Sequence, residues 1–195
     1  MYDIVYSEIA DKLVSDGYII IEDVLDKEMV SSLGEYANAQ NNFKKAGISA
    51  NVDLHLDQDR RRDKILWIDE DNGVQSYFLD FTNGLKEYLN RSLYLGLRYY
   101  ESHFAIYEKG DFYEKHLDAF KNSKNRIVTT VFYLNEDWDK DDGGELIIYD
   151  IDGNEITKVI PKSNTLVVFM SEDFPHEVLA AKTKRYSIAG WYRVD

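Results

Sequence analysis

The second half of the chain consists of short runs in which apolar and polar residues alternate, each ended by turn-forming residues. Alternation is typical of β-strands, whose successive side chains point to opposite faces of a sheet. Eight such runs are predicted to be strands: Tyr99–Tyr107, Phe112–Asp118, Ile127–Leu134, Glu145–Tyr149, Glu155–Ile160, Thr165–Phe169, Glu177–Ala180 and Arg185–Val194. Many short strands joined by turns indicate a sandwich or a jelly-roll barrel.

The first half has helical periodicity instead. Apolar residues recur at helical spacing over residues 3–15, over the segment that follows Asp26, and over residues 74–89. Asp26 is predicted to cap the second helix, since its side chain can accept a hydrogen bond from a free amide of the first turn. Two apolar runs in this half, Tyr18–Ile21 and Lys64–Ile68, are predicted to be strands.

Helices before strands indicate an α+β fold: a double-stranded β-helix (jelly-roll) core buttressed by N-terminal helices. We find no internal repeat, linker or low-complexity tract, and therefore predict a single domain over residues 1–195. Its helical support is expected at about 1–95 and its jelly-roll core at about 96–195.

Charge and cysteine content exclude some functions. The 195 residues carry a formal net charge of −13, which repels phosphate backbones, so no nucleic-acid partner is expected. The absence of cysteine excludes disulfides and thiolate metal sites. Neither a signal-peptide pattern nor an apolar stretch of membrane-spanning length occurs. We therefore expect a soluble, cytoplasmic protein, monomeric and without a membrane partner.

Residues 47–63 are polar and lack periodicity. One interpretation is a solvated loop. The other is a mobile lid, because long loops in compact domains are often functional.

A His-x-Asp pair lies in the second predicted strand of the second half. His116 and Asp118 are two residues apart, so a strand would present both on one face. Of the four histidines in the chain, His176 begins another predicted strand, and a jelly roll can bring such distant strand ends together. Two histidines and one carboxylate suit Fe(II) with open positions, and zinc is the competing interpretation. The alternative without a metal is a packed histidine and an unrelated surface pair.

Arg185 makes the iron interpretation more specific. It lies nine residues after His176 on the next predicted strand, and alternation places Ser187, Ala189 and Trp191 on its face. An iron oxygenase that uses 2-oxoglutarate needs a cation for the distal carboxylate of that cosubstrate, and a guanidinium can bind it through two hydrogen bonds. Zinc hydrolysis would not require this arginine. The alternative is a surface charge at the end of a strand.

The order of these motifs resembles a known family. The motifs are Tyr107…His116-Leu117-Asp118, Arg126…Tyr133-Leu134-Asn135, Gly143-Gly144-Glu145-Leu146, Pro175-His176-Glu177-Val178 and the run Arg185–Tyr192. Together they resemble the Fe(II)/2-oxoglutarate prolyl hydroxylases, and more narrowly the bacterial relatives of the hypoxia-inducible-factor prolyl hydroxylases. The resemblance covers roughly residues 60–193.

The resemblance implies a role for particular residues. The Fe(II) ligands would be His116, Asp118 and His176. Arg185 would pair with the distal carboxylate of 2-oxoglutarate, helped by the Tyr133 hydroxyl, and Tyr107 would lie near the end of the cosubstrate that chelates iron.

Three further residues are assigned to the lid and the substrate side. Asp63 resembles a position that pairs with Arg126 and anchors the lid, and Trp191 resembles a residue that lines the substrate side. Glu108 and Ala189 depart from residues common in the family. These departures leave open which protein the enzyme would recognise as its substrate.

The implied reaction is hydroxylation of a prolyl residue in a protein, with elongation factor Tu as the leading candidate. Fe(II) would be the cofactor, and 2-oxoglutarate and O2 the cosubstrates that yield succinate and CO2, with ascorbate as an optional addition. Three alternatives stay open: a hydroxylase of a free amino acid, a nucleic-acid demethylase, which the net charge disfavours, and a non-catalytic cupin-like binding module.

Overall fold

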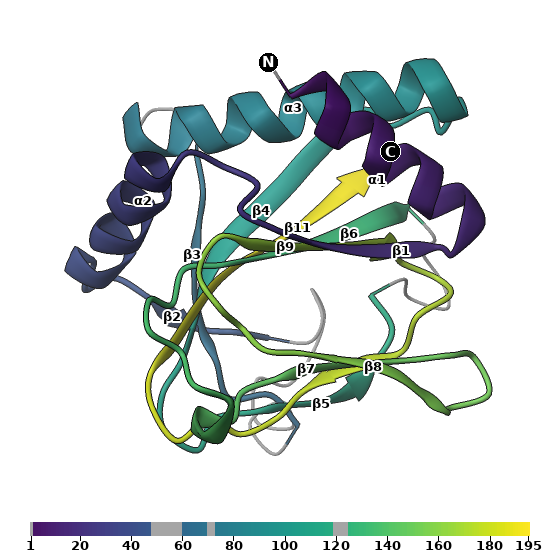
Figure 1. Cartoon of the computed structure of the whole chain (residues 1–195). Coiled ribbons are helices and arrows are strands. Elements are labelled where there is room, and N and C mark those ends of the chain that lie inside the picture. Colours follow the sequence, from purple (N-terminus) through teal and green to yellow (C-terminus); the bar gives the residue numbers. More distant parts are fainter. Residues whose placement is uncertain (1, 48–59, 70–72, 119–124) are drawn as a thin grey trace.

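Two antiparallel sheets face each other, and three helices cover the outer face of the larger sheet (Figure 1). The computed structural model describes residues 2–47, 60–69, 73–118 and 125–195. The larger sheet has the order β1 (Tyr18–Glu22), β9 (Thr165–Met170), β6 (Arg126–Tyr133), β11 (Arg185–Arg193), β4 (Tyr99–Tyr107), β3 (Lys64–Trp67), β2 (Lys44–Lys45). The smaller sheet has the order β5 (Tyr113–His116), β10 (His176–Val178), β7 (Leu146–Tyr149), β8 (Glu155–Val159). The predicted α+β class with a jelly-roll core is confirmed.

The helices lie close to the predicted positions. They are α1 (Asp3–Ser15), α2 (Lys27–Ala39) and α3 (Gly73–Leu93). The Asp26 side chain accepts a hydrogen bond from the Glu28 amide over 2.9 Å, as the capping argument requires. A short 3₁₀ turn, η1 (Lys140–Asp142), lies between β6 and β7. Three strands of the larger sheet, β1, β2 and β3, come from before residue 95, so that sheet is not confined to the second half of the chain.

Strands β4, β6 and β9 each contribute to two separate hydrophobic clusters. On β6, Val128 and Phe132 face the helices, whereas Val131 and Tyr133 face the space between the sheets. The helix-side cluster also contains four large side chains of α3: Phe78, Phe81, Leu85 and Leu89. Burying a side chain of this size stabilises a fold by about 1.5–3 kcal/mol. Because of this alternation, one face of the larger sheet packs against the helices, and the other face lines the interior between the two sheets.

Close packing of α1 on α3 depends on Gly84. A Cβ atom at this position would lie 2.6 Å from the Tyr6 hydroxyl oxygen. That hydroxyl donates a hydrogen bond to the Phe81 carbonyl over 2.8 Å, so the Tyr6 ring is held in place. Gly84 lowers the helix propensity of α3, but it makes room for this contact.

Most of the predicted lid, residues 48–59, lies outside the described residues. Its last part is described. The Arg62 amide donates to the Phe112 carbonyl over 3.1 Å, and the Glu114 amide donates to the Arg60 carbonyl over 2.8 Å. The segment before β3 therefore pairs with the segment that carries His116. No helix in the described ranges is long and apolar enough to cross a membrane.

Candidate metal centre

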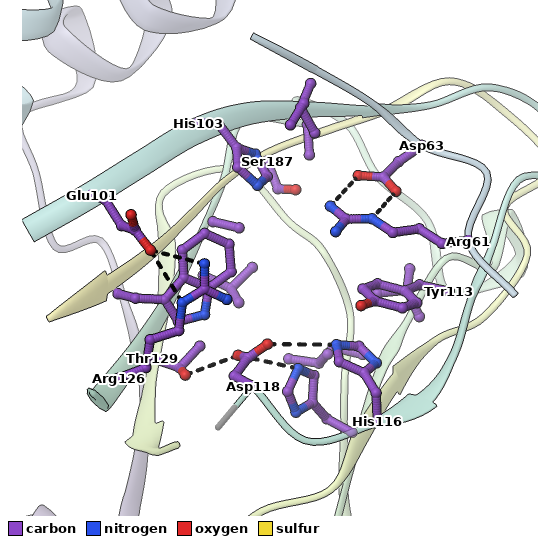
Figure 2. A pocket seen from close by; sticks show the side chains of 18 of the residues that line it. Arg61, Asp63, Glu101, His103, Tyr113, His116, Asp118, Arg126, Thr129 and Ser187 are labelled. Carbon is purple, nitrogen blue, oxygen red and sulfur yellow. Dashed lines mark hydrogen bonds and ion pairs between the residues drawn. The ribbon is translucent and has the colours of Figure 1, made fainter. Parts of the chain in front are cut away.

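A cavity of about 1000 Å³ lies between the two sheets (Figure 2). The smaller sheet contributes His116 and His176 to its wall, and the larger sheet contributes Arg185 and Trp191. Residues from distant parts of the sequence therefore face one space.

His116, Asp118 and His176 come together at one end of this cavity. One ligand atom from each lies within 4.8 Å of the others. His116 and His176 are direct partners in the antiparallel pairing of β5 with β10, and Asp118 follows two residues after His116. The Nε2 atoms of His116 and His176 lie 3.6 and 3.5 Å from the Asp118 carboxylate oxygens.

Backbone carbonyls orient both imidazoles. The Nδ1 atom of His116 lies 2.7 Å from the Glu114 carbonyl oxygen, and Nδ1 of His176 lies 3.0 Å from that of Phe174. A carbonyl oxygen only accepts, so each Nδ1 carries a proton, and Nε2 is the ring nitrogen that can bind a metal. Metal-binding histidines are commonly held in this way.

The protonation states also suit a metal. Burial lowers the pKa of His176 to about 4, so its imidazole is neutral near pH 7. Burial by itself would raise the pKa of Asp118, but nearby His176 and His116 outweigh it and hold that pKa well below its ordinary value. Two imidazole nitrogens and one carboxylate fit a divalent metal such as Fe(II). Within the described ranges, this is the one group of three or more histidines and carboxylates close enough to hold an ion.

Arg185 is a buried cation without a carboxylate partner among the described residues. It is 1% exposed. Its Nε donates to the Gly144 carbonyl over 2.9 Å, and Nη1 donates to the Ser187 hydroxyl over 3.2 Å. Its Nη2 atom has no hydrogen-bond partner in the described part of the chain. Burying an unpaired charge is costly, which indicates a place for an anion.

The Tyr133 hydroxyl lies beside this cation and also lacks a partner. Burial raises the pKa of Tyr133 to about 12, so the hydroxyl keeps its proton and can donate it. The guanidinium carbon of Arg185 lies 5.0 Å from the Tyr133 ring centroid and 4.8 Å from that of Tyr107. Two unsatisfied donors between two aromatic rings form a site for a carboxylate, so the residues present fit the predicted cosubstrate.

Tyr107 is buried, and burial raises its pKa well above the ordinary value. Its ring contacts Arg185. The nearby charge of Asp63 also raises the pKa of Tyr107, and that of Arg61 lowers it. Tyr107 therefore shares the cavity wall with three charged side chains: Arg185, Asp63 and Arg61. Its predicted contact with the iron-chelating end of the cosubstrate stays a prediction.

The predicted pairing of Asp63 with Arg126 is wrong. Both carboxylate oxygens of Asp63 accept hydrogen bonds from Arg61, at 2.6 and 2.9 Å, whereas Arg126 donates to Glu101 over 2.8 and 3.1 Å (Figure 2). The reason is sheet order. Asp63 immediately precedes β3, three strands from β6, where Arg126 begins; that separation is roughly 14 Å at ordinary strand spacing. Glu101 lies on β4, which is one strand nearer to β6 than β3 is.

Arg126 and Trp191 both line the cavity. The assignment of Trp191 to the substrate side stays a prediction. The guanidinium carbon of Arg126 lies 3.8 Å from the Trp191 ring centroid. The buried His103 ring is 5.4 Å from Trp191 on the same wall, and burial lowers the pKa of His103 to about 4. His103 lies on β4, and its place in the cavity wall was not anticipated from the sequence.

Tyr113 was not identified from the sequence. Its ring stacks on His116 at 3.6 Å between centroids and an interplanar angle of 15°, and the Arg61 guanidinium carbon lies 4.6 Å from the Tyr113 ring centroid. Strict alternation places residues three apart on opposite faces. The irregular register between β5 and β10 removes that constraint, and nothing in the sequence signals the irregularity.

Comparison with known proteins identifies similar chains. The model of the 2OG-Fe(II) oxygenase superfamily matches residues 102–193. A Pseudomonas putida prolyl-4-hydroxylase structure is 34% identical, with a TM-score of 0.88, over 97% of this chain and 99% of that one. A Trichoplax adhaerens prolyl hydroxylase, solved in complex with a hypoxia inducible factor peptide fragment, is 26% identical, with a TM-score of 0.85, over 98% of this chain and 90% of that one.

Human Egl nine homolog 1 is 31% identical over 186 residues, which are 90% of this chain and 43% of that protein. The chain thus spans about half the length of the first curated relatives that it matches, the human, rat and mouse proteins of that name.

Proposed function

The chain belongs to the 2OG-Fe(II) oxygenase superfamily, and from this we propose that it is a 2-oxoglutarate-dependent dioxygenase that hydroxylates a prolyl residue in a protein. One observation supports the proposal most directly. The cavity that His116, Asp118 and His176 line is also lined by Arg185, whose Nη2 has no hydrogen-bond partner among the described residues, and the guanidinium carbon of Arg185 lies 5.0 Å from the ring centroid of Tyr133. A metal site alone would fit many activities, whereas a metal site with a separate carboxylate site fits 2-oxoglutarate.

His116, Asp118 and His176 would hold Fe(II), which activates O2 so that a substrate C–H becomes C–OH while 2-oxoglutarate becomes succinate and CO2. Arg185 and Tyr133 would hold the distal carboxylate of the cosubstrate. The Gly144 carbonyl and the Ser187 hydroxyl fix the guanidinium plane before the cosubstrate arrives. Because the donors are oriented in advance, binding costs little reorganisation.

The aromatic rings around Arg185 exclude water from the charge pair. Tyr107 and Tyr133 are 4% and 0% exposed. A charge-assisted hydrogen bond is stronger in such surroundings than in water. The same rings limit the room at this end of the cavity, which suits a small dicarboxylate.

The proposal of a protein substrate rests on the relatives. The P. putida and T. adhaerens proteins are both prolyl hydroxylases, and the second was solved with a peptide. In this chain, Trp191 and Arg126 form a cavity wall that a peptide could contact. Elongation factor Tu is the protein to test first, on the strength of the family resemblance alone. The cytoplasmic location and the monomeric state remain predictions.

The test is incubation of the purified protein with Fe(II), 2-oxoglutarate, ascorbate and an extract of its source cells. Succinate would be measured, and peptides that gained one oxygen would be identified by mass spectrometry. We expect oxidised proline in one protein, and none with His176→Ala. Oxidation of lysine, asparagine, a nucleotide or free proline would reject the assignment to a prolyl residue in a protein. Absence of succinate formation would reject the proposal that the protein is a 2-oxoglutarate-dependent dioxygenase.

A further inference from the structure

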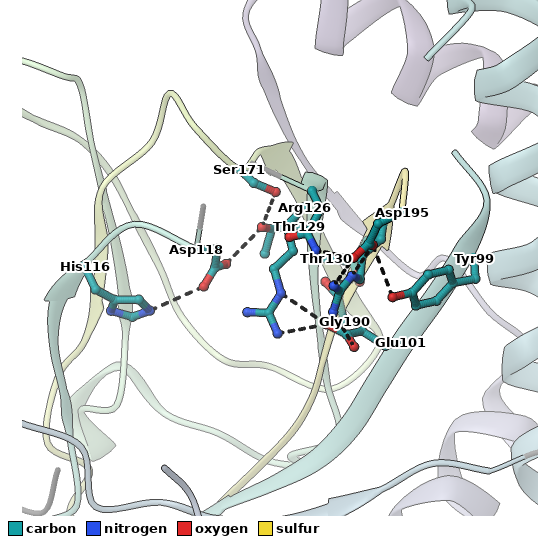
Figure 3. Close-up of polar contacts among 12 residues, drawn as sticks. Tyr99, Glu101, His116, Asp118, Arg126, Thr129, Thr130, Ser171, Gly190 and Asp195 are labelled. Atoms are coloured by element: carbon teal, nitrogen blue, oxygen red, sulfur yellow. Dashed lines mark hydrogen bonds and ion pairs between the residues drawn. The ribbon is translucent and has the colours of Figure 1, made fainter. Parts of the chain in front are cut away.

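Two buried hydroxyl groups connect the larger sheet to Asp118. Ser171 and Thr129 are 0% and 1% exposed. Their Oγ atoms lie 2.9 Å apart, and Oγ1 of Thr129 lies 2.9 Å from Oδ2 of Asp118. Figure 3 shows the three side chains in sequence, with His116 beyond Asp118.

The direction of these hydrogen bonds follows from counting protons. The Asp118 carboxylate only accepts, so the single proton of the Thr129 hydroxyl is donated to it. Thr129 then has only lone pairs for Ser171, and Ser171 must be the donor between them. The Ser171 amide donates to the Ile127 carbonyl over 3.0 Å, which holds Ser171 beside β6. The order is therefore Ser171 to Thr129 to Asp118.

These contacts matter because Asp118 lies outside the strand ladders. It follows β5 by two residues and precedes residues 119–124, which are outside the described ranges. Thr129 lies on β6, in the middle of the larger sheet. The Asp118 carboxylate, which follows a strand of the smaller sheet, is thus hydrogen-bonded to an interior strand of the larger sheet.

We propose that Thr129 and Ser171 are positioning residues that hold the Asp118 carboxylate for the metal and thereby set the metal affinity of the site. The proposal rests on the metal site of the proposed function. Thr129 acts on the ligand directly. Ser171 acts only through Thr129, because it fixes which way the threonine proton points.

The experiment is titration of metal-free protein with Co(II) by calorimetry, together with thermal unfolding of the same samples. Thr129→Val removes the hydroxyl and keeps the shape, and should weaken Co(II) binding by about 10- to 100-fold, the usual range for groups that support a metal ligand. Thr129→Ser keeps the hydroxyl and should bind like the wild type. Ser171→Ala should weaken binding by a smaller factor.

The double variant distinguishes the ordered arrangement from two independent effects. In the Thr129→Val background, Ser171→Ala should cause no further loss of affinity. The matched control is Thr130→Val on the opposite face of β6, where Oγ1 contacts the Tyr100 hydroxyl and the Gly190 carbonyl. This control should lower the unfolding temperature and leave Co(II) affinity unchanged.

Wild-type affinity in Thr129→Val would overturn the proposal while leaving the metal site intact. A further loss from Ser171→Ala in the Thr129→Val background would overturn the role given to Ser171. Failure of the wild-type protein to bind Co(II) would overturn the metal site itself, and both proposals with it. If Thr129→Val does not fold, Ser171→Ala and Thr129→Ser decide the question.

Discussion

The guanidinium carbon of Arg185 lies 5.0 Å from the ring centroid of Tyr133, and each side chain ends in a buried polar atom without a partner. The arginine Nη2 is a donor, and the tyrosine hydroxyl can donate its proton as well as accept. A ligand with acceptor oxygens would satisfy both.

Arg185→Ala should weaken binding of 2-oxoglutarate by roughly 1.5–3 kcal/mol, because it removes a hydrogen bond from a charged donor. Binding to the Mn(II)-loaded protein can be measured by calorimetry. Lys184→Ala, which changes the neighbouring cation, is the control and should bind like the wild type. Equal affinities for the two variants would refute the carboxylate site at Arg185.

Tyr133→Phe should affect the free and the bound protein differently. The variant removes a buried hydroxyl that has no partner, so the free energy of unfolding without cosubstrate should stay the same or rise. Affinity for 2-oxoglutarate should fall by about 0.5–1.5 kcal/mol, the value of a neutral hydrogen bond. Urea unfolding and calorimetry report the two quantities. Loss of stability without loss of affinity would show that Tyr133 only packs.

Acid should destabilise the metal-free protein through His103. Burial lowers the pKa of His103 to about 4 in the folded state, below the ordinary value of 6.5, so between these values the unfolded chain binds the proton more tightly. The free energy of unfolding should therefore fall as the pH drops from 6.5 towards 4, by about 2 kcal/mol from this group between pH 7 and pH 5.

His103→Gln cannot take up that proton and should lose correspondingly less stability over the same interval. Urea unfolding of both proteins at the two pH values measures the difference. His176 has the same shift in the same direction, so the variant should keep part of the acid sensitivity. An identical pH dependence in the two proteins would contradict the neutral, buried state of His103.

Two glycine-to-alanine substitutions in helices should change the free energy of unfolding in opposite directions. Gly84→Ala in α3 brings a Cβ to 2.6 Å from the Tyr6 hydroxyl and should destabilise the protein by about 1–3 kcal/mol, the usual cost of overpacking. Gly34→Ala in α2 meets only the Leu134 carbonyl oxygen, at 3.7 Å, and should stabilise by roughly 0.5–1 kcal/mol through helix propensity. Stabilisation by Gly84→Ala in urea unfolding would show that α1 moves freely against α3.

Alternation in the sequence was enough to predict which residues share a face. It places Tyr133 with Val131, and Arg185 with Ser187, and the structure has them so. The two-residue strand β2 was beyond reach, because a run that short carries no periodicity. Strand order and register are tertiary properties. The pairing of Asp63 with Arg126 was taken from the family resemblance, and the strand order of this sheet places Asp63 with Arg61 instead.

The residues of the candidate site likewise fall into those that the sequence indicated and those that it did not. Histidine is rare in this chain, so spacing and residue type suggested His116, Asp118 and His176 as one group. The family resemblance assigned them to Fe(II), and the structure brings them together. Ser171 and Thr129 gave no such signal, since serine and threonine are common and their roles depend on a contact across 42 positions of sequence. Tyr113 reaches His116 only through an irregular ladder.

The separation of the two hydrophobic clusters has an evolutionary consequence. On β4, β6 and β11, residues that face the cavity alternate with residues that anchor the helices. A substitution at a cavity-facing position such as Ala189 leaves its neighbour Ile188 in the helix-side cluster unchanged. Descendants of this chain can therefore acquire a new specificity by changing one cavity-facing residue at a time. The helix-facing residues of the same strands, which stabilise the fold, need not change.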